Sequence, residues 1–202
     1  MDGLTKPAVL MARLPCLVSV AALQADLALC LQLDWLAHVN VRDYQGGWDL
    51  LPLRCQRQHQ QAHPLLQGFA IEQGDDWVDL PLLAQLPAFS RLLAQLHCPL
   101  RAVRLMRLKA GAVIKPHRDH GLALEYGQAR LHLAIQTDQA VQFLVLGQHM
   151  PCQSGELWYF NADVEHQVHN QSAQDRIHLV IDAQANDWLR RQITCGSVDD
   201  GC

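Results

Sequence analysis

The sequence predicts a mainly β fold, in which an antiparallel sandwich or barrel is flanked by helices. Two observations predict it. From Pro99 onward, short alternating or apolar segments follow one another and are separated by turn residues such as Ala110-Gly111 and Ser154-Gly155, a pattern typical of antiparallel strands. Before Pro99, apolar residues recur at helical spacing in two longer stretches, which indicates helices beside the strands.

The first half of the chain supplies elements that brace the barrel. We expect a strand over residues 13–20, followed by an amphipathic helix over residues 21–38. A second strand is expected over residues 48–54. Residues 80–97 carry leucines at helical spacing, and Pro87 breaks this helix because proline cannot donate to the preceding turn.

The second half supplies the barrel itself. Its expected strands cover residues 101–109, 113–117, 130–137, 141–145, 156–160, 166–170 and 177–182. With neither a repeat nor a Gly/Ser linker in the sequence, we expect one domain over residues 1–202. Within it we expect a bracing region over 1–100, a metal-binding barrel core over 101–185 and a flexible tail over 194–202.

The composition excludes several classes of protein. Half of the 202 residues are hydrophobic and 18% are charged, which is enough to build a packed core. The net charge of −4, from 16 Lys+Arg against 20 Asp+Glu, argues against nucleic acid as a partner, since such proteins carry a basic face. No stretch approaches the roughly 20 apolar residues of a membrane span.

The cysteine pattern predicts reduced thiols and a cytoplasmic protein. Seven cysteines are scattered along the chain without a C-x-x-C pair, whereas a disulfide framework usually shows an even count in a small domain. The alternative is export, because the apolar residues 14–23 follow Arg13 like a short signal segment. Pro15 and the unpaired cysteines oppose that interpretation.

The segment Pro116-His117-Arg118-Asp119 carries the chemistry. In an extended chain, residues i and i+2 point to the same side, so His117 and Asp119 can share one space. A third ligand from a distant strand, His166 or His169, completes a set of two histidines and one carboxylate. Such a set leaves three metal positions open, as non-haem Fe(II) enzymes require. The plain alternative is a surface loop with a chance H-x-D sequence.

An arginine in an apolar strand adds to this picture. Arg176 begins the run Arg176-Ile177-His178-Leu179-Val180-Ile181-Asp182, and a buried guanidinium is costly unless it meets an anion. A dicarboxylate co-substrate that chelates the metal at one end supplies that anion at the other. His166 and Arg176 are separated by the length of a strand and a turn, so we expect both at one mouth of the barrel.

These motifs resemble the bacterial branch of the aspartyl/asparaginyl β-hydroxylase family, within the Fe(II)- and 2-oxoglutarate-dependent dioxygenases. The likeness is densest from Arg104 to Asp182 and looser from Trp35 to Arg54. The matching pieces are Arg104-Leu105 with Ala110-Gly111, Ile114-x-x-His117-x-Asp119, Arg130-Leu131-His132-Leu133, Gly155-Glu156-Leu157-Trp158, His166-x-Val168-x-Asn170 and the run from Arg176 to Asp182.

The resemblance implies a double-stranded β-helix, that is, a jelly roll or cupin-like barrel, with Fe(II) at one open end. By this likeness His117, Asp119 and His166 are the metal ligands. Arg176 holds the far carboxylate of 2-oxoglutarate, and Arg130 and His132 line the same pocket. One departure stands out: the animal aspartyl hydroxylases lack the carboxylate ligand, so the presence of Asp119 weakens the transfer of their substrate.

The implied function is an enzyme, an Fe(II)/2-oxoglutarate-dependent hydroxylase. It acts with O₂ on a C–H of an amino acid, free or in a peptide, protein or carrier-bound form, and decarboxylates 2-oxoglutarate to succinate. Arg118 is a candidate partner for a substrate carboxylate. The alternative is a non-catalytic cupin-like barrel that binds a metal or a small ligand. The sequence leaves open the oligomeric state, and whether His169 and His178 belong to the site.

Overall fold

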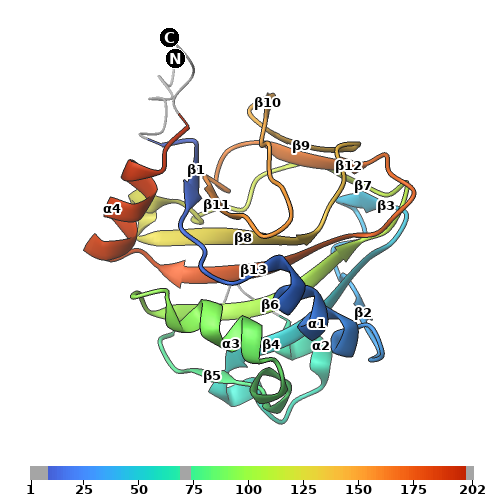
Figure 1. Ribbon diagram of the computed structural model, residues 1–202, viewed down its shortest axis with the longest axis vertical. Coiled ribbons are helices and arrows are strands. Elements are labelled where there is room, and N and C mark those ends of the chain that lie inside the picture. The colour runs from blue at the N-terminus through green and yellow to red at the C-terminus, as the bar shows by residue number, and fades with distance from the viewer. Residues whose placement is uncertain (1–8, 69–73, 199–202) are drawn as a thin grey trace.

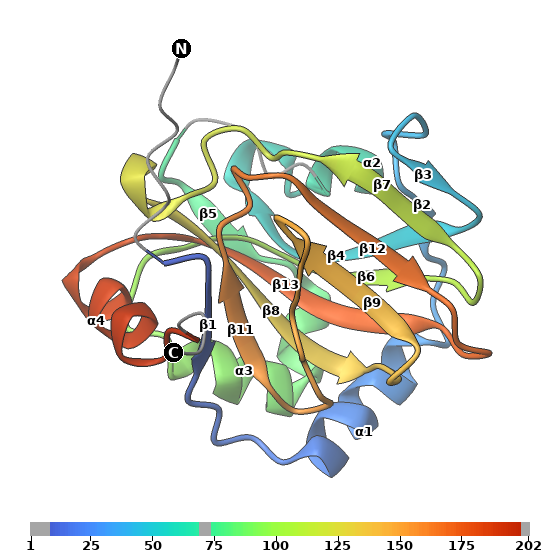
Figure 2. The same cartoon turned by 90° about the horizontal axis from the view of Figure 1, so that it is seen from above.

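Two antiparallel sheets, packed face to face, form the core of the computed structural model, which describes residues 9–68 and 74–198 (Figures 1 and 2). In order, the larger sheet contains β1 (Met11–Leu14), β11 (Leu157–Phe160), β8 (Gln128–Gln136), β13 (Arg176–Gln184), β6 (Leu100–Leu108), β4 (Trp48–Gln56) and β2 (Leu36–Ala37), and β5 (Trp77–Asp79) pairs with β4. The smaller sheet contains β10 (Gln148–His149), β9 (Val141–Val145), β12 (His166–Asn170), β7 (Val113–His117) and β3 (Tyr44–Gln45).

Helices flank the larger sheet. The α-helices are α1 (Val20–Cys30), α2 (Pro64–Gln67), α3 (Pro87–Ala94) and α4 (Asp187–Cys195), with 3₁₀ turns η1 (Arg57–His59), η2 (Pro81–Gln85) and η3 (Leu124–Tyr126). α1 and α3 lie against the outer face of this sheet, as Figure 1 shows, where Leu27 and Phe89 join one buried cluster with strand residues. The predicted mainly β fold with flanking helices is confirmed.

Alternation along the strands of the larger sheet separates an apolar face from a polar one. Leu131 and Leu133 of β8, with Leu179 of β13, pack toward the helices. Arg130 and His132 therefore point to the space between the sheets. Side chains such as Phe143 and Val168 of the smaller sheet face that space from the other side. The interior between the sheets thus holds buried polar groups within an apolar shell.

Element boundaries agree best with the sequence prediction in the barrel core. β7, β9 and β12 have the predicted bounds. The predicted helix over residues 21–38 is too long, because α1 ends at Cys30, whose carbonyl accepts a hydrogen bond from Trp35 Nε1. Leu36–Ala37 then pairs with β4 instead of extending the helix.

Helix α4 extends into the C-terminal segment that the sequence predicts as a tail. The flexible tail was expected from Thr194, but this residue and Cys195 complete α4, and Ser197 forms a bridge with Ala12 of β1. A Cβ atom at Gly196 would lie 2.0 Å from the carbonyl oxygen of Arg13, so only glycine permits this close approach. Residues 194–197 of the predicted tail therefore take part in α4 and in a bridge to β1, and residues 199–202 lie outside the described part of the chain.

Two further findings bear on the composition argument. Among the described residues, no helix has the length and apolar character that crossing a membrane requires. The cysteines that the structure describes, Cys16, Cys30, Cys55, Cys98, Cys152 and Cys195, are all free thiols, and Cys202 lies outside the described residues.

Replacing Asp26 with alanine is expected to lower the free energy of unfolding by about 1–2 kcal/mol. Its buried Oδ2 accepts hydrogen bonds from the backbone N–H groups of Ala88 and Phe89, at 2.8 and 2.9 Å. These are the first N–H groups of α3, which has no side-chain cap of its own. Urea unfolding would measure the effect, with the exposed Asp34→Ala variant as the control. Equal stability of the two variants would show that α3 does not need this carboxylate.

Candidate metal centre

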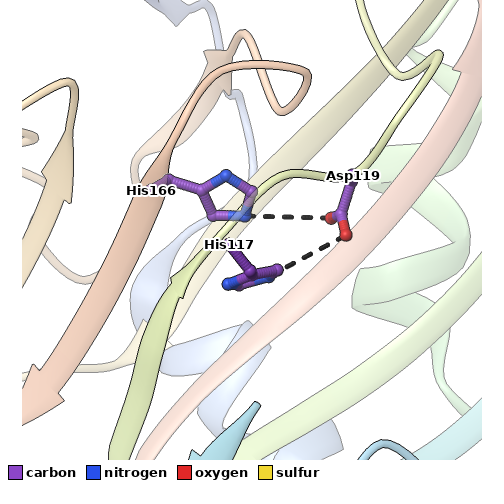
Figure 3. A group of neighbouring side chains, drawn as sticks. All are labelled: His117, Asp119 and His166. Carbon is purple, nitrogen blue, oxygen red and sulfur yellow. Dashed lines mark ion pairs between the residues drawn. The ribbon is translucent and has the colours of Figure 1, made fainter.

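Two neighbouring strands of the smaller sheet bring the predicted ligands together. His117 ends β7 and His166 begins β12, and these two residues are direct partners in the antiparallel register. Their ring centroids are 4.2 Å apart. Asp119 follows β7 by two residues, and its backbone N–H donates to the carbonyl of Ala162. Figure 3 shows its carboxylate pointing back toward both imidazoles.

The three side chains form a compact donor set. His117 Nε2 lies 3.8 Å from Asp119 Oδ1, and His166 Nε2 lies 3.8 Å from Asp119 Oδ2. All three ligand atoms lie within 4.8 Å of one another. Two donors bound at right angles to one ion, each about 2.1 Å from it, are about 3 Å apart. A small contraction of the group around an ion therefore gives metal-binding geometry.

Backbone contacts set the tautomer of both histidines. Nδ1 of His117 donates to the Lys115 carbonyl at 2.8 Å, and Nδ1 of His166 donates to the Val164 carbonyl at 2.9 Å. Because a carbonyl only accepts, Nδ1 carries the proton and Nε2 keeps its lone pair for a metal. Burial, and then the neighbouring His117, lower the pKa of His166 to about 4, so this ring is neutral at physiological pH.

A chain of buried ion pairs holds the carboxylate of this set. Arg130 Nη1 donates to Asp119 Oδ2, while its Nε and Nη2 donate to the two oxygens of Asp182, at 2.7 and 3.0 Å. Asp182 also accepts from Arg104 Nη1 at 2.9 Å. Burial alone would raise the pKa of Asp119, but Arg130, and then the two histidines, hold it below its usual value. Asp119 is therefore oriented and charged.

Arg176 lies elsewhere between the sheets and has no such partner. It is 2% exposed, its Nη2 donates to His178 Nδ1 at 2.9 Å, and its Nε finds no hydrogen-bond acceptor in residues 9–68 and 74–198. No carboxylate of the described residues forms an ion pair with it. Burial lowers its pKa to about 10, so it stays a cation at neutral pH. A buried, uncompensated guanidinium is costly unless an anion binds beside it.

The turn before β13 fixes where Arg176 lies. The buried Asn170 donates through Nδ2 to the carbonyls of Leu108, Lys109 and Gln174, and its Oδ1 accepts from Ser172. This amide ties the end of β12 to the end of β6. The His-x-Val-x-Asn run therefore combines a residue of the candidate donor set with a structural one.

One cavity joins all these groups. It has a volume of about 880 Å³ and is lined by His117, Asp119, His166, Arg176, Arg130 and His132, among others. His132 Nδ1 lies 3.4 Å from His178 Nδ1, and burial, followed by Arg176, keeps the pKa of both histidines well below the usual value. Both rings are therefore neutral, which leaves Arg176 as the cation of that region.

Other candidates from the sequence lie differently. Arg118 also borders the cavity, but its Nε and Nη2 donate to Asp163. His120 also borders the cavity, but its side chain is 83% exposed, its Nδ1 lies 3.7 Å from Asp163 Oδ1, and it is not part of the donor set. His169 contacts Gln171 and is not part of the donor set. His178 is fully buried as the hydrogen-bond partner of Arg176, and it is not one of the described residues that line the cavity.

Sequence reasoning assigned no role to Asp182 or Arg104. A signal was present for Asp182, because it shares the inward face of β13 with Arg176 by alternation and is an acid in an otherwise apolar run. The same argument that singled out Arg176 applies to it. Arg104 has the same inward direction on β6, and it borders the cavity.

Comparisons with known proteins agree with this geometry. A family model described as aspartyl/asparaginyl beta-hydroxylase matches residues 35–186. The L-proline cis-4-hydroxylase of Rhizobium meliloti (strain 1021) is 27% identical over 142 residues, which cover 69% of this chain and 49% of that protein. The chain thus spans about half the length of this curated relative.

Two solved structures share the fold. An oxidoreductase of the 2OG-Fe(II) oxygenase family from Burkholderia pseudomallei has a TM-score of 0.55 at 16% identity, over 88% of each chain. HygX from Streptomyces hygroscopicus, solved with nickel, 2-oxoglutarate and hygromycin B, has a TM-score of 0.55 at 13% identity, over 89% of this chain and 84% of that one. These likenesses confirm the predicted double-stranded β-helix.

Proposed function

The chain belongs to the aspartyl/asparaginyl β-hydroxylase family, and from this premise we propose that it is an Fe(II)- and 2-oxoglutarate-dependent hydroxylase of an amino-acid substrate. The buried Arg176, which has no ion-pair partner among the described residues, carries the proposal. Burying its charge is costly, and a carboxylate of bound 2-oxoglutarate would compensate that cost. The donor set of His117, Asp119 and His166 supplies the metal half of the same argument.

The residues fit Fe(II). Two neutral imidazole Nε2 atoms and one ionised carboxylate form a set that occupies one face of an octahedral ion and leaves the opposite face open. Their backbone hydrogen bonds fix both rings before a metal arrives. When bound, Fe(II) and 2-oxoglutarate supply the oxidation of a substrate C–H by O₂, with 2-oxoglutarate decarboxylated to succinate.

The residues also fit 2-oxoglutarate. Arg176 offers its free Nε–H to the far carboxylate of this dicarboxylate, and His178 holds the guanidinium through Nη2. His132 borders the same space beside Phe143 and Phe160. Arg130 does not offer its N–H groups to 2-oxoglutarate, because they already donate to Asp119 and Asp182. It therefore borders the co-substrate pocket while it orients the carboxylate ligand.

An amino acid is the substrate class that the comparisons favour, since the curated relative is an L-proline hydroxylase. In the proposed reaction, the protein binds the substrate in the rest of the cavity, beside the open face of the metal. Asp119 stays ionised and fixed by Arg130, so the ligand set keeps its geometry while substrates come and go.

The proposal is tested by succinate formation. Purified protein with Fe(II), 2-oxoglutarate and O₂ should form succinate slowly without any amino acid, and faster with its substrate. This turnover should require the metal ligands. If 2-oxoglutarate is neither bound nor decarboxylated, the hydroxylase proposal fails, and a non-catalytic metal- or ligand-binding barrel takes its place.

The His166→Ala and His117→Ala variants are expected to bind Fe(II) more than about 100-fold more weakly, since even the outer partners of metal ligands are worth 10–100-fold. Anaerobic calorimetric titration with Fe(II) would measure this. His169→Ala is the matched control, because this histidine lies on the same strand but outside the donor set. A loss of affinity as large in His169→Ala would contradict the proposed ligand set.

A further inference from the structure

The cavity is larger than 2-oxoglutarate requires. Its 880 Å³ lies near the upper end of the roughly 300–1,000 Å³ that encloses drug-sized molecules, and 2-oxoglutarate is much smaller than those. The remaining space extends along β6 and β4, where Arg104, Met106 and Leu50 line it. This part of the cavity is the place for a second small molecule.

Arg104 and Arg176 mark different parts of this cavity. Arg104 pairs with Val180 in the register of β6 and β13. Val180 is four residues from Arg176 along β13, which is about 13 Å at about 3.3 Å per residue. Arg104 is linked through Asp182 and Arg130 to the carboxylate of Asp119, whereas Arg176 has no part in that chain. Arg104 therefore lies toward the metal-centre end.

Arg104 has hydrogen-bonding capacity left over. It is 5% exposed, and within the described part of the chain its one hydrogen bond runs from Nη1 to Asp182 Oδ2. Its Nε and Nη2 have no acceptor among the described residues. Asp182 is also shared, since it accepts two bonds from Arg130. When the charge of Asp119 is neutralised by a bound metal, Asp182 is the one carboxylate that remains for both Arg104 and Arg130. One of the two positive charges is then left to pair with another anion.

An apolar wall adjoins this guanidinium. Met106 lies two residues from Arg104 on the same face of β6, and its direct partner on β4 is Leu50. Both line the cavity, as does Ile114 from the opposite sheet. A molecule with a carboxylate on Arg104 would place an aliphatic body against this wall.

We propose that Arg104 binds the carboxylate of the prime substrate, and that this substrate is a free amino acid with an aliphatic side chain, not a residue inside a protein chain. An arginine with two adjacent N–H donors matches a carboxylate in bidentate geometry. A residue within a polypeptide has an amide in place of that carboxylate and cannot make this pair. The proposal rests on the function proposed above and names its substrate class.

Calorimetric titrations test it on the full chain, loaded anaerobically with Fe(II) and 2-oxoglutarate. The probes are free aliphatic amino acids, among them L-proline and L-leucine, and the corresponding amides, L-prolinamide and L-leucinamide. The best free acid should bind at least about 30-fold more tightly than its amide, as expected for an ion pair shielded from water. Arg104→Gln should abolish this preference, and Arg104→Lys should retain part of it.

The matched control is Arg107→Gln, on the same strand, because Arg107 points away from the cavity and pairs with Asp49. It should keep the full preference for the acid. Arg107→Gln, titrated first with 2-oxoglutarate, should also bind it as the wild type does, and the partial preference kept by Arg104→Lys shows that the cavity tolerates a change at position 104.

Equal binding of acid and amide by the wild type overturns the proposal, as does a preference that survives in Arg104→Gln. It also fails if no free amino acid binds while 2-oxoglutarate does. Absence of 2-oxoglutarate binding to the wild type would instead overturn the proposed function, so the two failures are distinguishable.

Discussion

The Arg176→Met variant is expected to be more stable than the wild type without ligands, by about 1–3 kcal/mol, and to lose 2-oxoglutarate binding. A buried cation without a counter-ion costs several kcal/mol, and an apolar side chain of similar length removes that cost. The carboxylate of 2-oxoglutarate then loses its partner, which is worth about 2–5 kcal/mol, or roughly 30-fold to several thousand-fold in affinity. Stability and affinity therefore change in opposite directions.

Chemical unfolding with and without 2-oxoglutarate measures both effects. In the wild type with bound Fe(II), 2-oxoglutarate at 100 times its Kd should add about 2.7 kcal/mol to the free energy of unfolding, and in Arg176→Met it should add almost nothing. Arg57→Met is the control, because Arg57 forms an exposed pair with Asp76 and surface pairs contribute little. If Arg176→Met were destabilised and still bound 2-oxoglutarate, the role of Arg176 as the anion-binding residue would be wrong.

The Asp182→Ala variant is expected to lose about 3–5 kcal/mol of stability, since it leaves two buried guanidinium groups without their shared carboxylate. It should also weaken Fe(II) binding by about 10–100-fold, because Arg130 then no longer holds Asp119 in one orientation. Urea unfolding and Fe(II) titration measure these effects. Asp79→Ala removes a surface partner of Arg54 and should cost less than about 1 kcal/mol.

The carboxylate of Asp182 also makes the free energy of unfolding depend on pH. Burial alone would raise the pKa of Asp182, but Arg130 and then Arg104 lower it from 3.8 to about 2. Because the folded-state pKa lies below the unfolded one, the stabilisation is present above about pH 4 and is lost as the pH falls toward 2. It amounts to about 2 kcal/mol. In Asp182→Asn, this part of the acid-dependent loss of stability should be absent; an unchanged profile would show that Asp182 does not titrate in this range.

The fold was predictable where local pattern and tertiary pairing agree. The barrel strands β7, β9 and β12 alternate strongly and are bounded by turn residues, so their bounds follow from the sequence. The two-residue strands β2, β3 and β10 were not predicted, since such short segments have no period and form only because a neighbouring strand accepts their hydrogen bonds. The helix α4 was missed because few apolar residues mark its buried side.

The grouping of the candidate metal ligands follows in part from a local sequence pattern, whereas the ion-pair chain that supports Asp119 does not. His117 and Asp119 are only two residues apart, so a local pattern relates them, although Asp119 lies beyond the end of β7 and is held by its N–H bond to the Ala162 carbonyl. The partners Arg104 and Asp182 are separated by 78 residues, and Arg130 and Asp182 by 52. No local pattern relates such pairs, because only the order of strands β8, β13 and β6 in the sheet brings them together.

The hydrogen-bonded chain from Arg104 through Asp182 and Arg130 to Asp119 has a thermodynamic consequence. An anion at Arg104 and a cation at Asp119 act on opposite ends of one charge network, so each changes the free energy of binding the other. By linkage, the factor by which the anion changes the metal's equilibrium affinity equals the factor by which the metal changes the anion's. In the proposed enzyme, tighter binding of the substrate carboxylate would therefore change the metal's affinity by the same factor as the metal changes the affinity for the substrate.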